Sequence, residues 1–156
     1  MVDARPASPP YRVSGGGRLL AALIGGCCLS VLLVATQLTP RPDGLGTHRA
    51  LGLPECGFLV RTGLPCPACG MTTSFAWFVR GNLAASLYVQ PMGTALAVLC
   101  GLSVWAGFYI AITARPLHWL IFSAPPRQVA LPLLVLALAA WAWKIFIHLR
   151  GIDGWR

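Results

Sequence analysis

The sequence contains very little charge. Only 10% of its 156 residues are charged, whereas a soluble domain has about a quarter. Hydrophobic residues make up 56% of the chain. So few charged and so many apolar side chains cannot cover a surface that faces water, which excludes an ordinary soluble domain. We therefore expect an integral membrane protein.

Acidic residues are especially scarce. The chain has four of them, at Asp3, Asp43, Glu55 and Asp153, and no two have the spacing of an acid/base pair. The sequence also lacks a phosphate-binding glycine loop, a dinucleotide-binding fingerprint and the His-Glu-x-x-His motif of metalloproteases. These absences favour a protein that is not an enzyme, although they leave that question open.

The positive charges are almost all arginines, and they are spread singly along the chain. Lys144 is the only lysine, and the net charge is +8. No basic stripe of the kind that binds nucleic acid is present, so we expect no nucleic-acid partner. Single arginines that flank apolar segments are typical of membrane proteins, where they meet lipid head groups. We interpret Lys144 as a lysine near the end of a span whose long stem reaches the head groups.

Three apolar segments are long enough to cross a bilayer. They cover residues 19–39, 92–114 and 129–149. A helix of 21 residues is roughly 31 Å long, close to the thickness of the hydrocarbon core. The sequence therefore predicts three transmembrane helices and contact with the lipid bilayer.

The remaining segments frame a single membrane domain. Residues 1–17, rich in Pro, Gly and Ser, predict a disordered tail. The membrane domain covers 18–150, and 151–156 form a short second tail. Its longest loop, 40–91, begins with Pro and Gly and contains Asn82, a good N-cap for a short helix. We predict an all-α membrane protein with three transmembrane helices and one or two short interfacial helices in this loop.

Small residues recur at every fourth position in the first two predicted spans. The rows are Ala22, Gly26 and Ser30; Gly93, Ala97 and Gly101; and Ser103, Gly107 and Ala111. Such rows let helix backbones approach each other closely. We interpret them as packing within the chain, with a homo-oligomer or another membrane protein as the alternative partner.

The reactive side chains gather between residues 56 and 81. This stretch holds Cys56, Cys66 and Cys69. Pro67 suits the first position of a helix, which would place Cys66 at the N-cap and Cys69 three residues later on the same face. The two sulfurs could then meet. The other three cysteines, Cys27, Cys28 and Cys100, fall inside predicted spans, where a thiol behaves as a small apolar group.

Three interpretations of the cysteine loop stay open. The loop can be structural, with a disulfide or with thiols packed in a tight turn that docks the short helix on the bundle, and it can dock a partner protein. It can bind a metal through Cys56, Cys66 and Cys69, with His48 as a fourth ligand, giving a Cys3His set suited to zinc. It can instead be a thiol–disulfide oxidoreductase in which Cys66 attacks and Cys69 resolves. Only the last interpretation assigns catalytic residues, and we commit to none.

The motif resembles that of a known family. The matching positions are Cys56, Thr62-Gly63, Cys66-Pro67-Ala68-Cys69-Gly70-Met71-Thr72, Gly81-Asn82-Leu83 and Gln90-Pro91. In this pattern the sequence is similar to the small bacterial membrane proteins grouped as domain of unknown function 2752. The resemblance covers about residues 50–125. It implies a multi-pass protein of the bacterial inner (cytoplasmic) membrane, and it brings no activity.

One departure from the family pattern concerns charge. The usual Arg after Cys-Gly-x-Thr is Thr73 here. If that Arg serves as the partner of a thiolate or an anion, its role is either missing here or passes to Arg61 or Arg80. We expect the hydroxyls of Thr72, Thr73 and Ser74 to bond carbonyls within their own helix.

Overall fold

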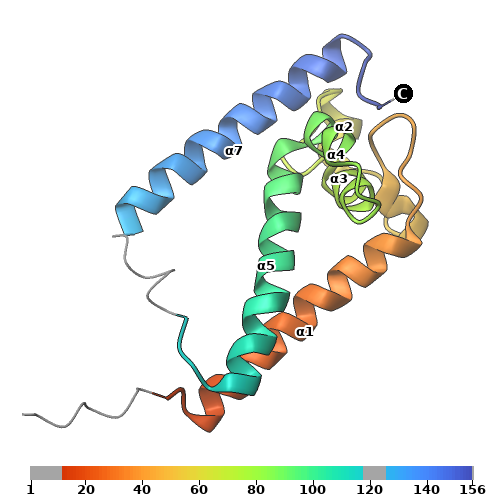
Figure 1. Cartoon of the computed structure of the whole chain (residues 1–156). Coiled ribbons are helices and arrows are strands. Elements are labelled where there is room, and N and C mark those ends of the chain that lie inside the picture. Colours follow the sequence, from red (N-terminus) through yellow and green to blue (C-terminus); the bar gives the residue numbers. More distant parts are fainter. Residues whose placement is uncertain (1–11, 118–125, 156) are drawn as a thin grey trace, which may run out of the picture.

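Three long helices and several short ones make up the fold, with no strand among the described residues (Figure 1). The computed structural model describes residues 12–117 and 126–155. The long helices are α1 (Gly15–Gln37), α5 (Pro91–Thr113) and α7 (Pro126–Leu149). Each has the length and the apolar composition to cross a membrane, with mean hydropathies of 2.4, 2.1 and 2.0. The predicted all-α fold with three spans is confirmed, and the chain is an integral membrane protein.

The start of the first span differs slightly from its predicted limit. Helix α1 begins at Gly15, inside the segment assigned to the tail, because the Ser14 hydroxyl accepts the N–H of Gly17 at 3.3 Å. Residues 1–11 of the predicted tail lie outside the described residues. So do residues 118–125 of the connector between α5 and α7.

Helices α1 and α5 run antiparallel and cross where two glycines meet (Figure 1). A Cβ on Gly107 would lie 2.5 Å from a carbonyl oxygen of α1 and 3.0 Å from the Cα of Gly25. Beyond the crossing, the Arg18 side chain donates two hydrogen bonds to the carbonyl of Ala111, at 2.8 and 2.6 Å. The small residues around Gly107 therefore pack within the chain, as their spacing indicated.

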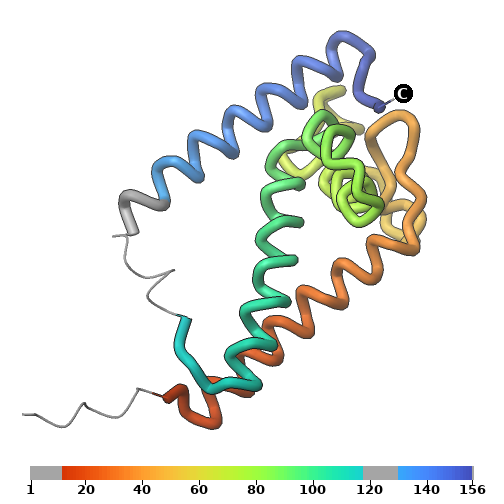
Figure 2. Tube along the Cα trace, in the orientation of Figure 1, coloured from red at the N-terminus to blue at the C-terminus, as the bar shows by residue number. Residues whose placement is uncertain are grey.

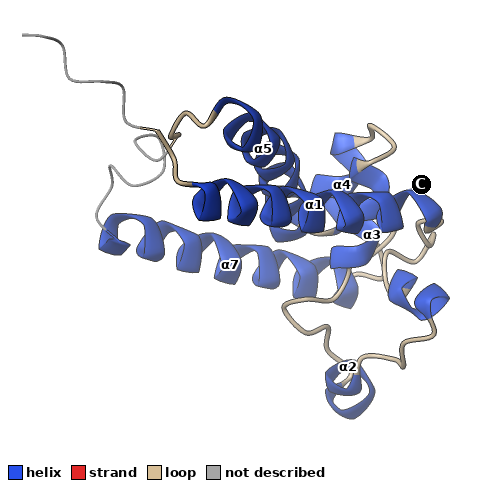
Figure 3. Ribbon diagram, turned by 90° about the horizontal axis from the view of Figure 1, so that it is seen from below, coloured by secondary structure: helices blue, strands red, loops and turns tan. Residues whose placement is uncertain are grey.

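The loop between the first two spans is largely helical. It contains the 3-10 helix η1 (Thr47–Leu51) and the helices α2 (Gly57–Thr62), α3 (Met71–Phe78) and α4 (Leu83–Val89). These are more short helices than the one or two predicted. Asn82 caps α4 as expected, since its side chain accepts the N–H of Ala85 at 2.9 Å. Figure 2 follows the chain through this region, and Figure 3 shows α2 set apart from α3 and α4.

Buried hydroxyl groups join α3, α4 and α5. Ser74 Oγ lies 2.9 Å from Ser86 Oγ and 3.0 Å from Thr94 Oγ1, and the last two are 2.7 Å apart. Thr73 bonds to the hydroxyl of Thr47 at 2.7 Å. The expectation that Thr73 and Ser74 bond within their own helix is therefore wrong. In an apolar surrounding, a hydroxyl that faces a neighbouring helix finds its partner there.

Helix α7 joins the rest of the protein near its C-terminal end. The indole N–H of Trp141 donates to the Pro65 carbonyl at 3.0 Å, and that of Trp143 donates to the Tyr88 carbonyl at 2.8 Å. Towards its start α7 diverges from α5 (Figure 1), and Leu131 and Val135 are exposed there. This part of α7 therefore presents apolar side chains to the bilayer.

Lys144 corrects one prediction from the sequence. Its side chain is completely buried, with Nζ 3.0 Å from Asp153 Oδ1. Asp153 Oδ2 lies 2.7 Å from Nδ1 of His148. The interpretation that Lys144 reaches the head groups is wrong, because the chain turns back after α7 and places a carboxylate beside the ammonium. A buried lysine needs such a partner.

Candidate metal centre

Three cysteine sulfurs converge in the loop between the first two spans. The Sγ atoms of Cys56, Cys66 and Cys69 all lie within 4.8 Å of one another. Cys56 is the N-cap of α2, and the other two belong to the turn before α3. The Cys66 and Cys69 sulfurs are 3.3 Å apart, in contact as their spacing predicted. All three are free thiols, and Cys69 is buried.

The turn that carries Cys66 and Cys69 differs from the predicted one. We expected a helix from Pro67, but α3 begins at Met71. The N–H of Cys69 donates to the Cys66 carbonyl at 3.0 Å, which closes a tight turn. Gly70 follows with φ of 89°, a left-handed conformation that ends the turn and restarts the chain as α3. The sulfurs meet because of this turn rather than because of helical spacing.

Gly70 also allows a close approach to the rest of the protein. A Cβ there would lie 3.2 Å from the Gly44 carbonyl oxygen and 3.4 Å from Cε of Lys144. The buried Lys144–Asp153 pair therefore packs directly behind the cysteine turn. One signal in the sequence pointed to a special position for Lys144, because it is the only lysine and falls inside a span.

Side chains from α7 and from the start of α5 bond to backbone carbonyls of the segment around the cysteines. Gln90, which is buried just before α5, donates from Nε2 to the Pro67 carbonyl at 2.7 Å. Trp141 of α7 holds the Pro65 carbonyl, and His148 Nε2 lies 3.2 Å from the Gly63 carbonyl. Both ring nitrogens of His148 thus lie within hydrogen-bond distance of an acceptor oxygen. None of these supports was assigned from the sequence.

The three thiols differ in acidity. The backbone N–H of Leu59 lowers the pKa of Cys56 from 9.0 to about 7, because it stabilises the thiolate. Burial raises the pKa of Cys69 to about 12, and the hydrogen bond to Cys66 adds to this effect. Near neutral pH the metal-free site therefore carries a ready thiolate at Cys56 and a protonated thiol at Cys69.

The spacing of the sulfurs suits a single metal ion. Zinc–sulfur bonds of about 2.3 Å place tetrahedral thiolates about 3.8 Å apart. Here the Cys66 and Cys69 sulfurs are 3.3 Å apart, and no pair is more than 4.8 Å apart, which is close to that value. Three thiolate ligands favour soft metals such as zinc over magnesium or calcium. Small shifts of the turn would therefore complete a three-sulfur site.

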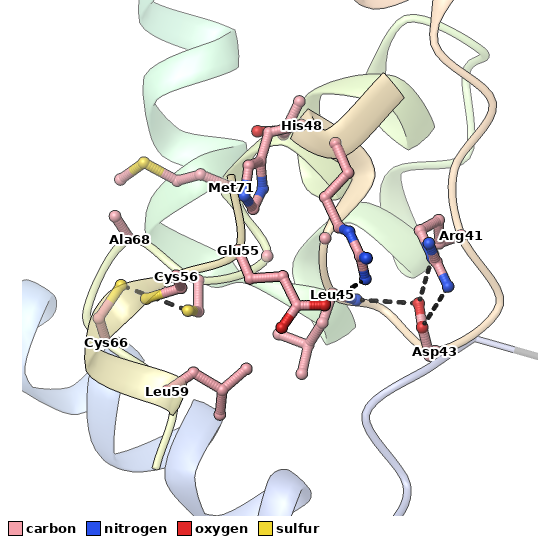
Figure 4. Close-up of a pocket in the computed structure, with 15 residues that line it drawn as sticks. Arg41, Asp43, Leu45, His48, Glu55, Cys56, Leu59, Cys66, Ala68 and Met71 are labelled. Atoms are coloured by element: carbon pink, nitrogen blue, oxygen red, sulfur yellow. Dashed lines mark hydrogen bonds and ion pairs between the residues drawn. The ribbon is translucent and has the colours of Figure 1, made fainter. Parts of the chain in front are cut away.

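His48 lies near the cysteines but outside their cluster. Its Nε2 is 3.1 Å from the carbonyl of Pro54, and the group within 4.8 Å holds the three sulfurs alone among the described residues. His48 does line the same cavity (Figure 4). The structure therefore brings together three of the four candidate ligands and places the fourth at the wall of a shared space.

Arg61 and Arg80 were the two candidates to replace the family's usual Arg. Neither is placed as a partner of the cysteine sulfurs. Arg80 donates to the carbonyls of Ala76 and Thr36, at 2.7 and 3.3 Å, and so ties α3 to the end of α1. Arg61 is exposed on α2. The cation that packs against the cysteine turn is Lys144.

A cavity of about 520 Å³ opens beside the sulfurs (Figure 4). Its far rim carries two ion pairs, Arg41 with Asp43 at 3.1 Å and Arg49 with Glu55 at 2.7 Å. The cavity is large enough for a small ligand, and the cysteines form part of its wall. A metal held by three sulfurs would therefore have an open side.

The fold and the site define an integral membrane protein with three candidate spans and a cysteine cluster in the loop between the first two. Residues 56–104 match the model of a family described as "Protein of unknown function (DUF2752)". This match confirms the family resemblance predicted from the motif. No curated protein and no solved structure matches the chain.

Proposed function

We propose that the loop between the first two spans binds one soft divalent metal ion, zinc in the first place, through Cys56, Cys66 and Cys69. The observation that carries the proposal is the convergence of three sulfurs from two separate segments within 4.8 Å. The lowered pKa of Cys56 supports it, because a metal binds the thiolate form.

The proposed metal would join α2 to the turn before α3. Metal binding contributes folding free energy when the ligands are far apart in the unfolded chain. Cys56 and Cys66 are ten residues apart, so the ion would close this part of the loop. The fourth coordination position would face the cavity, where water, His48 after a rearrangement, or a group from a docked partner protein can occupy it.

The test is metal analysis of the protein purified in detergent, with single serine variants. We expect about one zinc per chain in the wild type. Cys56→Ser, Cys66→Ser and Cys69→Ser should each lower zinc affinity by more than about 100-fold, since each removes a ligand. Cys100→Ser, at a thiol within α5, is the matched control and should retain zinc. No bound metal in any preparation would refute the proposal.

A second candidate function is thiol–disulfide exchange, favoured by the 3.3 Å contact between Cys66 and Cys69. The Cys66 thiolate would attack a substrate disulfide and release one substrate thiolate. Cys69 would then attack the mixed disulfide, so that the substrate is reduced and Cys66–Cys69 is oxidised. The high pKa of Cys69 opposes this second step, and for this reason we place metal binding first. Thiol trapping across a redox titration tests the candidate, which fails if no Cys66–Cys69 disulfide forms.

We further propose that the protein lies in a bacterial inner membrane. The resemblance of the cysteine motif to that of small bacterial membrane proteins supports this location, and so do the three apolar helices. Labelling of Cys56 with a membrane-impermeant thiol reagent, from each side in turn, would show which compartment the loop faces. That compartment decides whether free thiols persist there.

A further inference from the structure

A second cavity lies in the membrane-spanning part of the molecule, next to the cysteine cavity. Its volume is about 410 Å³, and its wall is almost entirely apolar. Val31 and Val34 line it from the last turns of α1, and Leu38 lines it from the C-cap of that helix. Leu51 and Phe75 line it from η1 and α3. We call this space the α1 groove.

The length of the α1 groove, measured along α1, is close to the thickness of the hydrocarbon layer of one leaflet. It extends along α1 from Cys27 to Leu38. At 1.5 Å per residue this stretch is about 16 Å long, close to half of the roughly 30 Å hydrocarbon core. The groove therefore begins near the middle of the membrane and ends where the loop begins, which is the path of an acyl chain.

The α1 groove and the cysteine cavity share a wall. Met71 and Thr72 line both. The groove has apolar walls, whereas the cysteine cavity carries Arg41, Arg49 and their acidic partners at its rim. An apolar space thus lies directly beside a polar space at the end of α1.

The charges of the rim select the kind of head group. The two ion pairs are about half-exposed, with side-chain exposures of 45% and 54% for Arg41 and Asp43 and 48% and 54% for Arg49 and Glu55. Exposed pairs of this kind contribute little stability and can exchange partners. A ligand with both a phosphate and a primary ammonium could bond an arginine and a carboxylate at once.

We propose that the two cavities together bind one phospholipid of the adjacent leaflet, with an acyl chain in the α1 groove and a phosphoethanolamine head group in the cysteine cavity. The phosphate lies at Arg41 and Arg49, and the ammonium lies at Asp43 or Glu55. This lipid site goes beyond the proposed metal site and does not require it. It places a lipid head group beside the three cysteines.

The experiment measures lipids retained by the protein. The metal-stripped full chain is reconstituted in vesicles of phosphatidylethanolamine, phosphatidylglycerol and diacylglycerol in equal amounts, extracted in mild detergent and examined by native mass spectrometry. We expect about one retained phosphatidylethanolamine per chain, in excess over the other two lipids. Because the metal is removed, failure of zinc binding leaves this result unaffected.

Two pairs of variants locate the lipid. Val34→Trp fills the α1 groove and should lower retention about tenfold or more, whereas Val98→Trp, at an exposed position of α5 outside both cavities, should not. Arg49→Gln should remove the preference for phosphatidylethanolamine over diacylglycerol, whereas Arg61→Gln should keep it. Both test positions are partly exposed, so the variants should fold.

Three results would overturn the proposal. One is a wild type that retains no lipid. Another is equal retention of diacylglycerol or phosphatidylglycerol and phosphatidylethanolamine, since the rim would then select no head group. The third is an equal effect of each test variant and its control, because binding would then take place elsewhere on the apolar surface.

Discussion

Two helix contacts hold the spans together, and they are made in opposite ways. Helices α1 and α5 meet through Gly25 and Gly107, where the lack of side chains lets the backbones touch. Helix α7 meets the loop through polar side chains: the indole of Trp141 donates to the Pro65 carbonyl, and Lys144, paired with Asp153 of the C-terminal segment, packs behind Gly70. The first contact is close and apolar, and the second consists of a few directed interactions.

The difference indicates which contact the cysteine site depends on. The glycine crossing lies within the spans, away from the loop (Figure 1). The contact of α7 lies directly behind the cysteine turn, where Lys144 packs against Gly70 and Trp141 holds the carbonyl of Pro65. We therefore expect damage to the α7 contact to change both stability and metal binding, and damage to the glycine crossing to change stability alone.

The largest expected effect is a difference in thiol reactivity within the cysteine cluster that the α7 contact supports, between Cys56 and Cys69. In metal-stripped protein, the thiolate fraction of Cys56 rises as pH increases through about 7, whereas Cys69, with a pKa of about 12, stays protonated. At about pH 8, alkylation by a water-soluble reagent should therefore favour Cys56 over Cys69 by orders of magnitude. Cys28 and Cys100, within the apolar spans, serve as shielded references. Mass spectrometry of peptides from pH 5.5 to 9 gives the midpoint, and a Cys56 midpoint near 9 would contradict the assignment.

Removal of the buried ammonium should have the next largest effect. Lys144→Met leaves Asp153 with the His148 contact alone among its side-chain partners in the described residues, and it should lower the free energy of unfolding by about 3 kcal/mol, since loss of one member of a buried pair is costly. It should also weaken zinc binding, because Lys144 packs behind Gly70. Unfolding in mixed micelles and zinc competition with a chelator measure the two effects.

Arg150→Met is the matched control for this substitution. Arg150 lies just after α7 and is exposed over the ring of Phe146, so its loss should change stability by less than about 1 kcal/mol. The double variant Lys144→Met with Asp153→Asn should be less destabilised than the sum of its parts. Strict additivity would show that Lys144 and Asp153 do not stabilise each other.

A smaller effect is expected at the glycine crossing. Gly107→Ala places a methyl group 2.5 Å from a backbone oxygen of α1, so the helices must separate, at a cost of about 1–3 kcal/mol. Gly101→Ala, which meets nothing within 4 Å, should be neutral or slightly stabilising because alanine favours helix. Zinc affinity should be unchanged in both variants. A loss of zinc affinity in Gly107→Ala would mean that the crossing also shapes the site.

The sequence predicted the spans and the cysteine cluster because these depend on local pattern. Apolar length marks a transmembrane helix, and the two-residue spacing keeps Cys66 and Cys69 close in either a helix or a turn. The left-handed Gly70 was not predicted, since glycine permits that conformation without requiring it. The Lys144–Asp153 pair depends on how the chain returns after α7, which local pattern does not determine. The same holds for Gln90 and Trp141, whose partners lie 23 and 76 residues away.

The smallest predicted effect concerns one hydrogen bond of the α7 contact. Trp141→Phe keeps an aromatic ring but removes the N–H that holds the Pro65 carbonyl, next to Cys66. A lost hydrogen bond of this kind is worth about 1 kcal/mol, so zinc affinity should fall about threefold to tenfold. Trp105→Phe is the control, because Trp105 is exposed on α5 and stacks on Tyr109. If the two variants bind zinc equally, α7 contributes to the stability of the fold but does not position Cys66, and the two helix contacts would then differ in chemistry alone.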